Sequence, residues 1–211
     1  MPPITNRRNS PRKKSHTKSQ SQSKKNNQRG LVRIIAGFHR GRRLPVIVSE
    51  GLRPTSDRVK ETLFNWLMNK TAQSVCLDLF AGSGGLGIEA LSRGASQVYF
   101  IERDKTVAST IQKNLETLKE TEKSAVLVND ALTIEYDELP KFDLVFIDPP
   151  FGKNLVSQSI NKLIQHSQLA ENAMIYVEVG HDDSFTAPTQ FKLVKEIKTS
   201  QVSAFLYEFS Q

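Results

Sequence analysis

Residues 74–90, SVCLDLFAGSGGLGIEA, are the stretch that decides the fold. Their first seven residues have the length and apolar composition of a buried β-strand, and a glycine-rich turn and a helical pattern follow. Gly82, Gly84 and Gly87 have the spacing G-x-G-x-x-G, which lets a backbone approach a nucleotide closely at the start of a helix. The stretch therefore predicts the first strand, loop and helix of a nucleotide-binding α/β domain.

Strands and helices alternate through the rest of the chain. Further strands are expected at 97–102, 124–130, 142–148, 173–179, 192–200 and 201–209, with helices at 104–119 and 154–169. Strands joined by crossover helices run parallel, and the last two strands follow each other as an antiparallel pair. We predict a doubly wound, mostly parallel, seven-stranded sheet.

Charge divides the chain unevenly. The formal net charge of +7 combines sixteen Lys/Arg and two acids in residues 1–60 with thirteen Lys/Arg and twenty acids in residues 61–211. A basic N-terminal part on an acidic body indicates a polyanionic partner such as nucleic acid. Residues 1–30 have nine Lys/Arg, no acid and few apolar residues, so we expect a disordered basic arm. We divide the remainder into a hairpin-and-helix extension, 31–70, and a main domain, 71–211.

The extension carries basic residues at a predicted turn. Two β-branched runs within residues 31–48 predict a hairpin, and the helix after it is capped by Thr55, Ser56 or Asp57. The expected RNA-contacting residues are those near the hairpin tip and two arginines beside the helix start: His39, Arg40, Arg42, Arg43, Arg53 and Arg58. For Arg58 an ion pair with Glu61 is the alternative.

Composition argues against several classes of protein. The chain has no apolar run of about 18 residues, the length that a membrane-spanning helix needs, and no hydrophobic secretory signal. Its single cysteine, Cys76, fits a reducing, cytoplasmic compartment. The four histidines lack the spacing of metal ligands, so no metal site is expected.

The ligand of the glycine-rich loop is suggested by nearby charges. Asp78 stands four residues before Gly82, and residues 71–92 contain no Lys or Arg. Such a site favours a ligand that carries an amino group and a positive charge, and S-adenosylmethionine (SAM) is one. The same glycine pattern also occurs in nicotinamide-dependent dehydrogenases, which remain an alternative.

At this point the sequence resembles the class I SAM-dependent methyltransferases, whose first motif has the form D-x-F-x-G-x-G. The matching residues are Asp78, Phe80, Gly82 and Gly84. The resemblance implies that Glu102 binds the ribose hydroxyls and that Asp130, with the amide of Ala131, binds the adenine. For Asp130 a helix cap after the strand is the alternative.

A second motif ends the predicted strand 142–148. Asp148, Pro149, Pro150 and Phe151 follow in sequence, and neither proline has an N–H group. Each proline also restricts the residue before it to extended conformations. The turn therefore presents hydrogen-bond acceptors to an amino group, and Phe151 is expected to stack on a base. The motif resembles the motif of amino methyltransferases in which Asp or Asn is followed by two prolines and Tyr or Phe.

The order of the motifs over about residues 31–211 resembles the RsmD-type bacterial rRNA (guanine-N2)-methyltransferases. This resemblance implies methylation of one guanine of 16S rRNA, within an assembled small ribosomal subunit. We expect the enzyme to be a monomer. A DNA or RNA adenine amino methyltransferase would keep the same catalytic residues and is the alternative. A glutamine methyltransferase and a non-catalytic RNA-binding protein are further possibilities, which the sequence motifs favour less.

Overall fold

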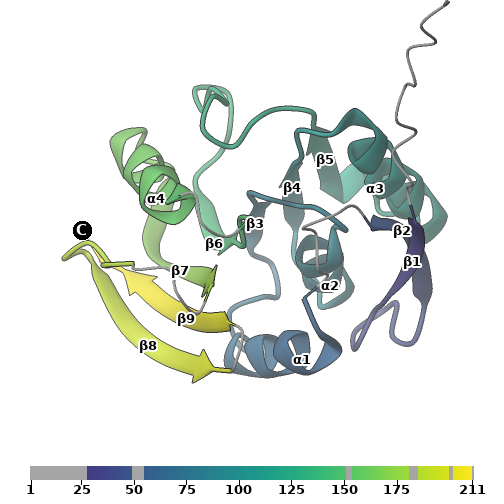
Figure 1. The fold of residues 1–211 in the computed structure, drawn as a ribbon, viewed down its shortest axis with the longest axis horizontal. Coiled ribbons are helices and arrows are strands. Elements are labelled where there is room, and N and C mark those ends of the chain that lie inside the picture. The colour runs from purple at the N-terminus through teal and green to yellow at the C-terminus, as the bar shows by residue number, and fades with distance from the viewer. Residues whose placement is uncertain (1–27, 49–54, 151–153, 181–184, 200–201, 211) are drawn as a thin grey trace, which may run out of the picture.

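The computed structural model of the chain describes residues 28–48, 55–150, 154–180, 185–199 and 202–210 (Figure 1). Its strands are β1 Gln28–Arg33, β2 Arg43–Val48, β3 Val75–Asp78, β4 Gln97–Ile101, β5 Ser124–Leu127, β6 Phe142–Ile147, β7 Leu169–Gly180, β8 Phe191–Lys198 and β9 Val202–Phe209. Its α-helices are α1 Asp57–Trp66, α2 Gly85–Ser92, α3 Lys105–Leu118 and α4 Leu155–Gln165, and a 3-10 turn, η1, spans Thr121–Lys123. The predicted disordered arm lies outside the described residues, apart from the start of β1 at Gln28.

The main sheet has seven strands in the order β5-β4-β3-β6-β7-β9-β8. The strands from β5 to β7 run parallel, and β9 inserts antiparallel between β7 and β8. The predicted mostly parallel, seven-stranded sheet and its closing antiparallel pair are confirmed. The arrangement follows from the sequence pattern, because crossover helices force parallel pairing and the short turn before β9 forces antiparallel pairing.

Both faces of the sheet are covered by apolar side chains. The first face packs with α1, α2, α3 and the hairpin, through residues such as Phe64, Ile88 and Ile111. The second face packs with α4 and with the segment between β5 and β6, through residues such as Ile160 and Tyr136. Burial on both faces explains why the parallel strands read as almost continuous apolar runs.

Polar residues begin two of the helices. Ser56 accepts a hydrogen bond from the amide of Val59 at 3.3 Å, and Asp104 accepts from the amide of Thr106 at 2.8 Å. These contacts satisfy amide groups that have no partner within the first turn of a helix. Ser56 is thus the one of the three predicted caps that serves α1.

The hairpin is a separate two-stranded sheet fastened to α2 and α3. Glu89 of α2 accepts hydrogen bonds from the amides of Ile35 at 2.8 Å and Ala36 at 3.0 Å. Asn114 of α3 donates to the carbonyl of Pro45 at 3.0 Å. Figure 1 shows the hairpin at the edge of the molecule beside these helices, on the side opposite β8. Partly buried polar contacts of this kind fix its orientation as well as its position.

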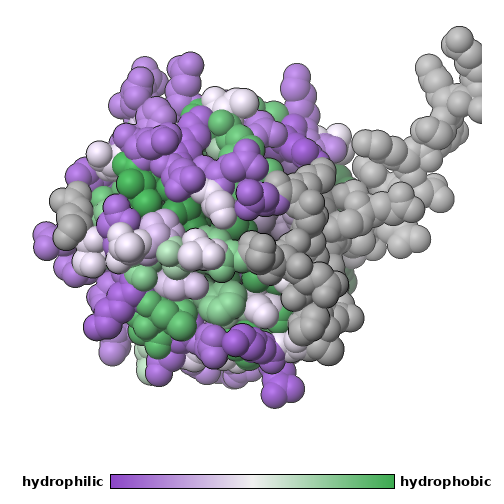
Figure 2. Space-filling view, turned by 60° about the vertical axis from the view of Figure 1, so that its left-hand side comes forward, coloured by the Kyte–Doolittle hydropathy of each residue, from purple (hydrophilic) through white to green (hydrophobic). Residues whose placement is uncertain are grey.

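None of the described helices is long and apolar enough to cross a membrane. Figure 2 brings the side with α4 and β8 forward and shows hydrophobic and hydrophilic residues interspersed there. Leu193 and Val194 of the edge strand β8 are 47% and 41% exposed, and lysines stand on both sides of them in the sequence. Charged side chains on an edge strand oppose pairing with another chain.

Candidate active site

The strand order reverses between β3 and β6, which are neighbours in the centre of the sheet. In α/β proteins, ligands bind where the loops diverge at such a switch point. Asp78 is the last residue of β3, and Asp148 follows the last residue of β6. Asp78 pairs in register with Phe146, two residues before Asp148. The fold therefore brings the acids of the two predicted motifs to one end of adjacent strands.

Two carboxylates hold the glycine-rich loop. The amide of Gly82 donates to Oε2 of Glu102 at 2.9 Å, and the amide of Gly87 donates to Oδ2 of Asp78 at 3.0 Å. Gly84, the N-cap of α2, has a φ of 71°, a left-handed conformation that favours glycine. The loop is thus a tight turn whose amides are oriented by the acids beneath it.

Asp78 is buried, with 3% of its surface exposed. Burial raises the pKa of Asp78 to about 7, the hydrogen bond from Gly87 lowers it, and the charge of Glu102 raises it. A buried carboxylate poised near neutral pH is strongly stabilised by a cation, because a positive charge favours its ionised form. This environment suits an ammonium group placed beside the loop.

The expected ribose and adenine residues follow β4 and β5. Glu102 is 9% exposed, and its Oε1 accepts from the amide of Asp104 at 2.8 Å. Asp130 is exposed and accepts from the amide of Leu132 at 2.9 Å, the capping contact weighed as the alternative to adenine binding. Ala131 beside it is buried. The adenine contact stays a prediction, since a carboxylate can cap a turn with one oxygen and bind a ligand with the other.

Asp148 is held by a residue outside its own motif. Oγ1 of Thr55, just before α1, donates to Oδ2 of Asp148 at 3.2 Å. Burial raises the pKa of Asp148 well above its ordinary value, the charges of Glu178 and Asp78 raise it further, and the bond from Thr55 lowers it. Part of Asp148 is still exposed to solvent. The carboxyl group is therefore oriented, partly accessible and a stronger proton acceptor than an ordinary aspartate.

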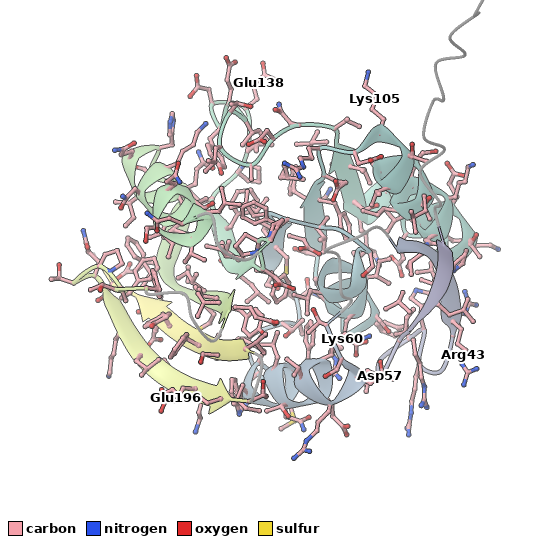
Figure 3. The ribbon with its side chains drawn as sticks, viewed as in Figure 1. Arg43, Asp57, Lys60, Lys105, Glu138 and Glu196 are labelled. Carbon is pink, nitrogen blue, oxygen red and sulfur yellow. The ribbon has the colours of Figure 1, made fainter. Side chains whose placement is uncertain are left out.

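Helix α1, which begins at this contact, is anchored by a buried lysine. Lys60 is 1% exposed and donates to the carbonyl of Arg33, and its Nζ lies 3.6 Å from Oδ1 of Asp57. Figure 3 labels Lys60 and Asp57 side by side at this helix. Burial lowers the pKa of Lys60, while the charge of Asp57 raises it. Through this anchor the position of Thr55 depends on the hairpin.

Two residues near Asp148 were not predicted as site residues. Glu178 of β7 is 7% exposed, and its Oε2 accepts a hydrogen bond from the hydroxyl of Tyr176 at 2.9 Å. The signal available in the sequence was a single acid within the otherwise apolar strand AMIYVEV. Thr55 was expected only as a candidate helix cap, and no local pattern links it to Asp148.

The residues of the hairpin tip differ in their surroundings. Arg40, Arg42 and Arg43 are exposed, and Figure 3 shows Arg43 extending from the hairpin at the edge of the molecule. Phe38 is 82% exposed, which is unusual for a large apolar ring. His39 instead has a side chain only 11% exposed, with Nε2 2.7 Å from Oε1 of Glu120.

The structure describes some, but not all, of the remaining predicted site residues. Phe80 is half-buried behind the glycine-rich loop, whereas Pro149 is buried and Pro150 half-buried.

Arg58 is exposed on the first turn of α1, and no ion pair between Arg58 and Glu61 occurs in the described structure. Arg53 and Phe151 lie outside the described residues. Within those residues, no group of three or more His, Cys, Asp or Glu could hold a metal ion.

Comparisons with known proteins show the family to which this chain is related. A family model described as conserved hypothetical protein 95 matches residues 32–208. The ribosomal RNA small subunit methyltransferase D of Haemophilus influenzae is 53% identical over 186 residues, covering 86% of this chain and 96% of that protein. The protein of the same name from Escherichia coli is 44% identical, covering 85% of this chain and 90% of the relative.

This chain belongs to the small subunit methyltransferase D family.

Solved structures support the assignment to the methyltransferase D family. An Escherichia coli structure described as a candidate methyltransferase superposes with a TM-score of 0.79 at 43% identity, covering 86% of this chain and 99% of that one. A Haemophilus influenzae structure described as a candidate methylase gives a TM-score of 0.76 at 49% identity, with 86% and 100% covered. The predicted class I methyltransferase fold is confirmed.

The protein is a methyltransferase, and its cofactor is SAM. The residues of this methyltransferase D site fit that cofactor. Asp78 offers a buried carboxylate that a cation would stabilise, and Glu102 is oriented by two backbone amides with lone pairs left to accept from hydroxyl groups. When bound, SAM supplies an electrophilic methyl group on a positively charged sulfur.

Proposed function

We propose that this methyltransferase methylates the exocyclic 2-amino group of one guanine in 16S rRNA, within the assembled small ribosomal subunit. We further propose that it acts in the cytoplasm as a monomer. The relatives named ribosomal RNA small subunit methyltransferase D support an rRNA substrate. The choice of a guanine amino group rests on the resemblance in the N-terminal third and on the chemistry of Asp148.

The observation that carries the proposal is the environment of Asp148. An exocyclic amine is a poor nucleophile because its lone pair is delocalised into the base. A carboxylate that accepts one of its hydrogens favours the pyramidal amine and directs the lone pair away from the ring. Asp148 is held for this by Thr55, and no N–H group of Pro149 or Pro150 competes for it. Its raised pKa also lets it take the proton that methyl transfer releases.

RNA binding is assigned to the hairpin and to the start of α1. Arg40, Arg42 and Arg43 are exposed and able to contact phosphates, and the exposed ring of Phe38 offers a surface on which an unpaired base can stack. Arg53 and Arg58 stand on either side of the segment that begins α1 in the sequence and are proposed to contact the RNA as well. For His39 we propose a structural role instead: it holds the hairpin in place, because Nε2 of its ring contacts Oε1 of Glu120.

The cofactor contacts follow the predicted motif. Asp78 would receive the ammonium group, Glu102 the ribose hydroxyls, and Asp130 with the amide of Ala131 the adenine. The loop around Gly82 and Gly84 would pack against the methionine part of the ligand. Phe151 would stack on the target guanine once that base has left its helix.

The test is methyl transfer from labelled SAM to three substrates: small subunits that lack the modification, the same rRNA freed of protein, and duplex DNA. Asp148→Asn keeps the shape of the side chain and removes its charge, and Asp137→Asn, exposed in the loop before β6, is the matched control. Label on a guanine 2-amino group of subunit rRNA, reduced about 10²–10³-fold by Asp148→Asn alone, is expected. Label on DNA adenine alone would overturn the proposal in favour of an adenine methyltransferase.

A further inference from the structure

Lys60 is a buried cation that the proposed mechanism does not use. It lies on the first turn of α1 with 1% of its surface exposed. Burial lowers the pKa of Lys60, while the charges of Asp57 and Glu89 raise it. Removing an ammonium group from water is costly, and its replacement by an apolar side chain is often neutral or stabilising. The buried lysine is therefore better explained by the geometry that it fixes than by a gain in stability.

Lys60 and Glu89 hold the same short segment of the hairpin from two different helices. Nζ of Lys60, on α1, donates to the carbonyl of Arg33. Glu89, on α2, accepts from the amides of Ile35 at 2.8 Å and Ala36 at 3.0 Å. A cation thus binds the carbonyl and an anion binds the amides, so each charge meets backbone groups of matching polarity. These contacts fix the segment relative to both helices.

The first turn of α1 also lies next to the hydroxyl that holds Asp148. The amide of Lys60 donates to the carbonyl of Ser56 at 3.0 Å. Thr55, which precedes Ser56, donates from Oγ1 to Oδ2 of Asp148 at 3.2 Å. A single helical turn therefore connects the hairpin contact of Lys60 with the hydroxyl of Thr55. Because helix ends fray, a side chain that ties down this turn also restrains Thr55.

We propose that Lys60 is a positioning residue for methyl transfer, which ties the start of α1 to the hairpin and so holds Thr55 within hydrogen-bonding distance of Asp148. Its effect on the reacting groups is exerted through Thr55. The inference rests on the proposed function, since it requires that Asp148 accept from the target amine. The same contact connects the hairpin that is proposed to bind RNA with the proposed proton acceptor.

The test is the pH dependence of methyl transfer to subunit rRNA by Lys60→Met, whose side chain has a similar length but neither charge nor N–H donor. The hydrogen bond from Thr55 lowers the pKa of Asp148, so a weaker bond raises it. The rising limb of the rate should then move to higher pH. On its acidic side kcat should fall about 2–10-fold, the factor that one hydrogen bond is worth. SAM affinity should stay within about twofold of wild type, because distant sites couple little.

A second background separates positioning from a direct effect of the lysine charge. The other groups that face Asp148 are Asp78 of β3 and Glu178 and Tyr176 of β7, and all are retained in Lys60→Met. In Thr55→Val, the addition of Lys60→Met should cause no further displacement of the profile, because the bond through which Lys60 acts is already absent. A displacement of the same size in that background would show a direct action and overturn the positioning role.

Three further variants complete the design. Lys60→Arg keeps the charge and the N–H donors and should restore the wild-type profile. Lys70→Met is the matched control, because Lys70 lies just beyond α1 with 48% of its side chain exposed, and its profile should match wild type. Lys60→Gln is one bond shorter and still polar. It should move the profile in the same direction as Lys60→Met, and it replaces that variant if the latter folds poorly.

A wild-type pH profile in a folded, SAM-binding Lys60→Met would overturn the inference. So would a loss of rRNA affinity with an unchanged profile, which would assign Lys60 to the hairpin alone. Failure of the proposed function has a different signature: either the wild-type enzyme leaves the subunit guanine unlabelled, or Asp148→Asn labels it as fast as the wild type does.

Discussion

Nε2 of His39 lies 2.7 Å from Oε1 of Glu120, so the tip of the basic hairpin is fastened to the segment that follows α3. The amide of His39 also donates to Oγ of Ser92 at 3.0 Å, at the end of α2. His39 therefore holds the hairpin against the rest of the protein, although it lies within a basic run, while the arginines beside it remain exposed.

Replacing His39 and Arg40 should separate these two roles. His39→Ala leaves the mostly buried Glu120 carboxylate without its imidazole partner and should lower the free energy of unfolding by about 1–3 kcal/mol. Arg40→Ala should leave that free energy within about 0.5 kcal/mol, because its side chain is exposed. Urea unfolding measures both.

The salt dependence of RNA binding provides the matching readout. Arg40→Ala should reduce the slope of log K against log salt by about 1, since one phosphate contact is lost. His39→Ala should leave the slope unchanged. A reduced slope for His39→Ala would contradict the packing role.

Thr55→Val should impair the chemical step without weakening SAM binding. The hydrogen bond from Thr55 lowers the pKa of Asp148, so its removal raises that pKa further. At a given pH less carboxylate is then ionised, and the rising limb of the rate against pH should move to higher pH. Thr55→Ser, which retains the hydroxyl, should restore the profile, and a profile that is identical in Thr55→Val would refute the contact's role.

Asp78 should make the stability of the ligand-free protein depend on pH. Its pKa is raised from 3.8 to about 7, so between these values the folded protein holds a proton that the unfolded chain has lost. This contribution is complete below the lower value and disappears as pH rises to the upper one, an effect on the order of 4 kcal/mol. The difference in unfolding free energy between wild type and Asp78→Asn should change by this amount between about pH 4 and about pH 8. Parallel curves for the two proteins would show that Asp78 does not titrate in this range.

SAM binding should follow the same titration in the opposite sense. The ammonium group attracts the ionised carboxylate, so binding must displace the proton that Asp78 holds below about pH 7. Affinity should rise up to about tenfold per pH unit toward pH 7 and level off above it. Calorimetry of Asp78→Asn should give a weaker affinity with a flatter pH dependence, and an equally steep dependence in the variant would assign the titration to another group.

Gly87 should tolerate no side chain. An added Cβ would lie 2.3 Å from Cε1 of the buried Phe100 ring, so Gly87→Ala must displace α2 or β4 and should cost about 1–3 kcal/mol. Gly85 is the matched control on the same helix, where the nearest atom would be the Ser83 hydroxyl at 3.2 Å. Thermal unfolding should show a clear drop for Gly87→Ala and a smaller change for Gly85→Ala. Equal losses would point to helix propensity instead of the ring contact.

Local sequence patterns predicted the candidate site residues, but they did not predict which other residues these would contact. Asp78, Glu102 and Asp148 were predicted as site residues because each stands at a strand end beside a turn motif, a feature that a few neighbouring residues encode. Glu178 was missed because a strand interior has no comparable signature. The partners of His39 and Thr55 were missed because each lies far away in the chain.

The sequence by itself determined the seven-stranded α/β sheet, the glycine-rich loop and the acid before two prolines, because strand periodicity, glycine conformation and proline rigidity are local properties. Only the tertiary structure decided which side chains meet. The register of β6 with β7 set Glu178 beside Asp148, and the packing of the hairpin on α2 and α3 brought the ring of His39 to Glu120. Such contacts depend on how whole elements pack against each other, and no short stretch of chain specifies that.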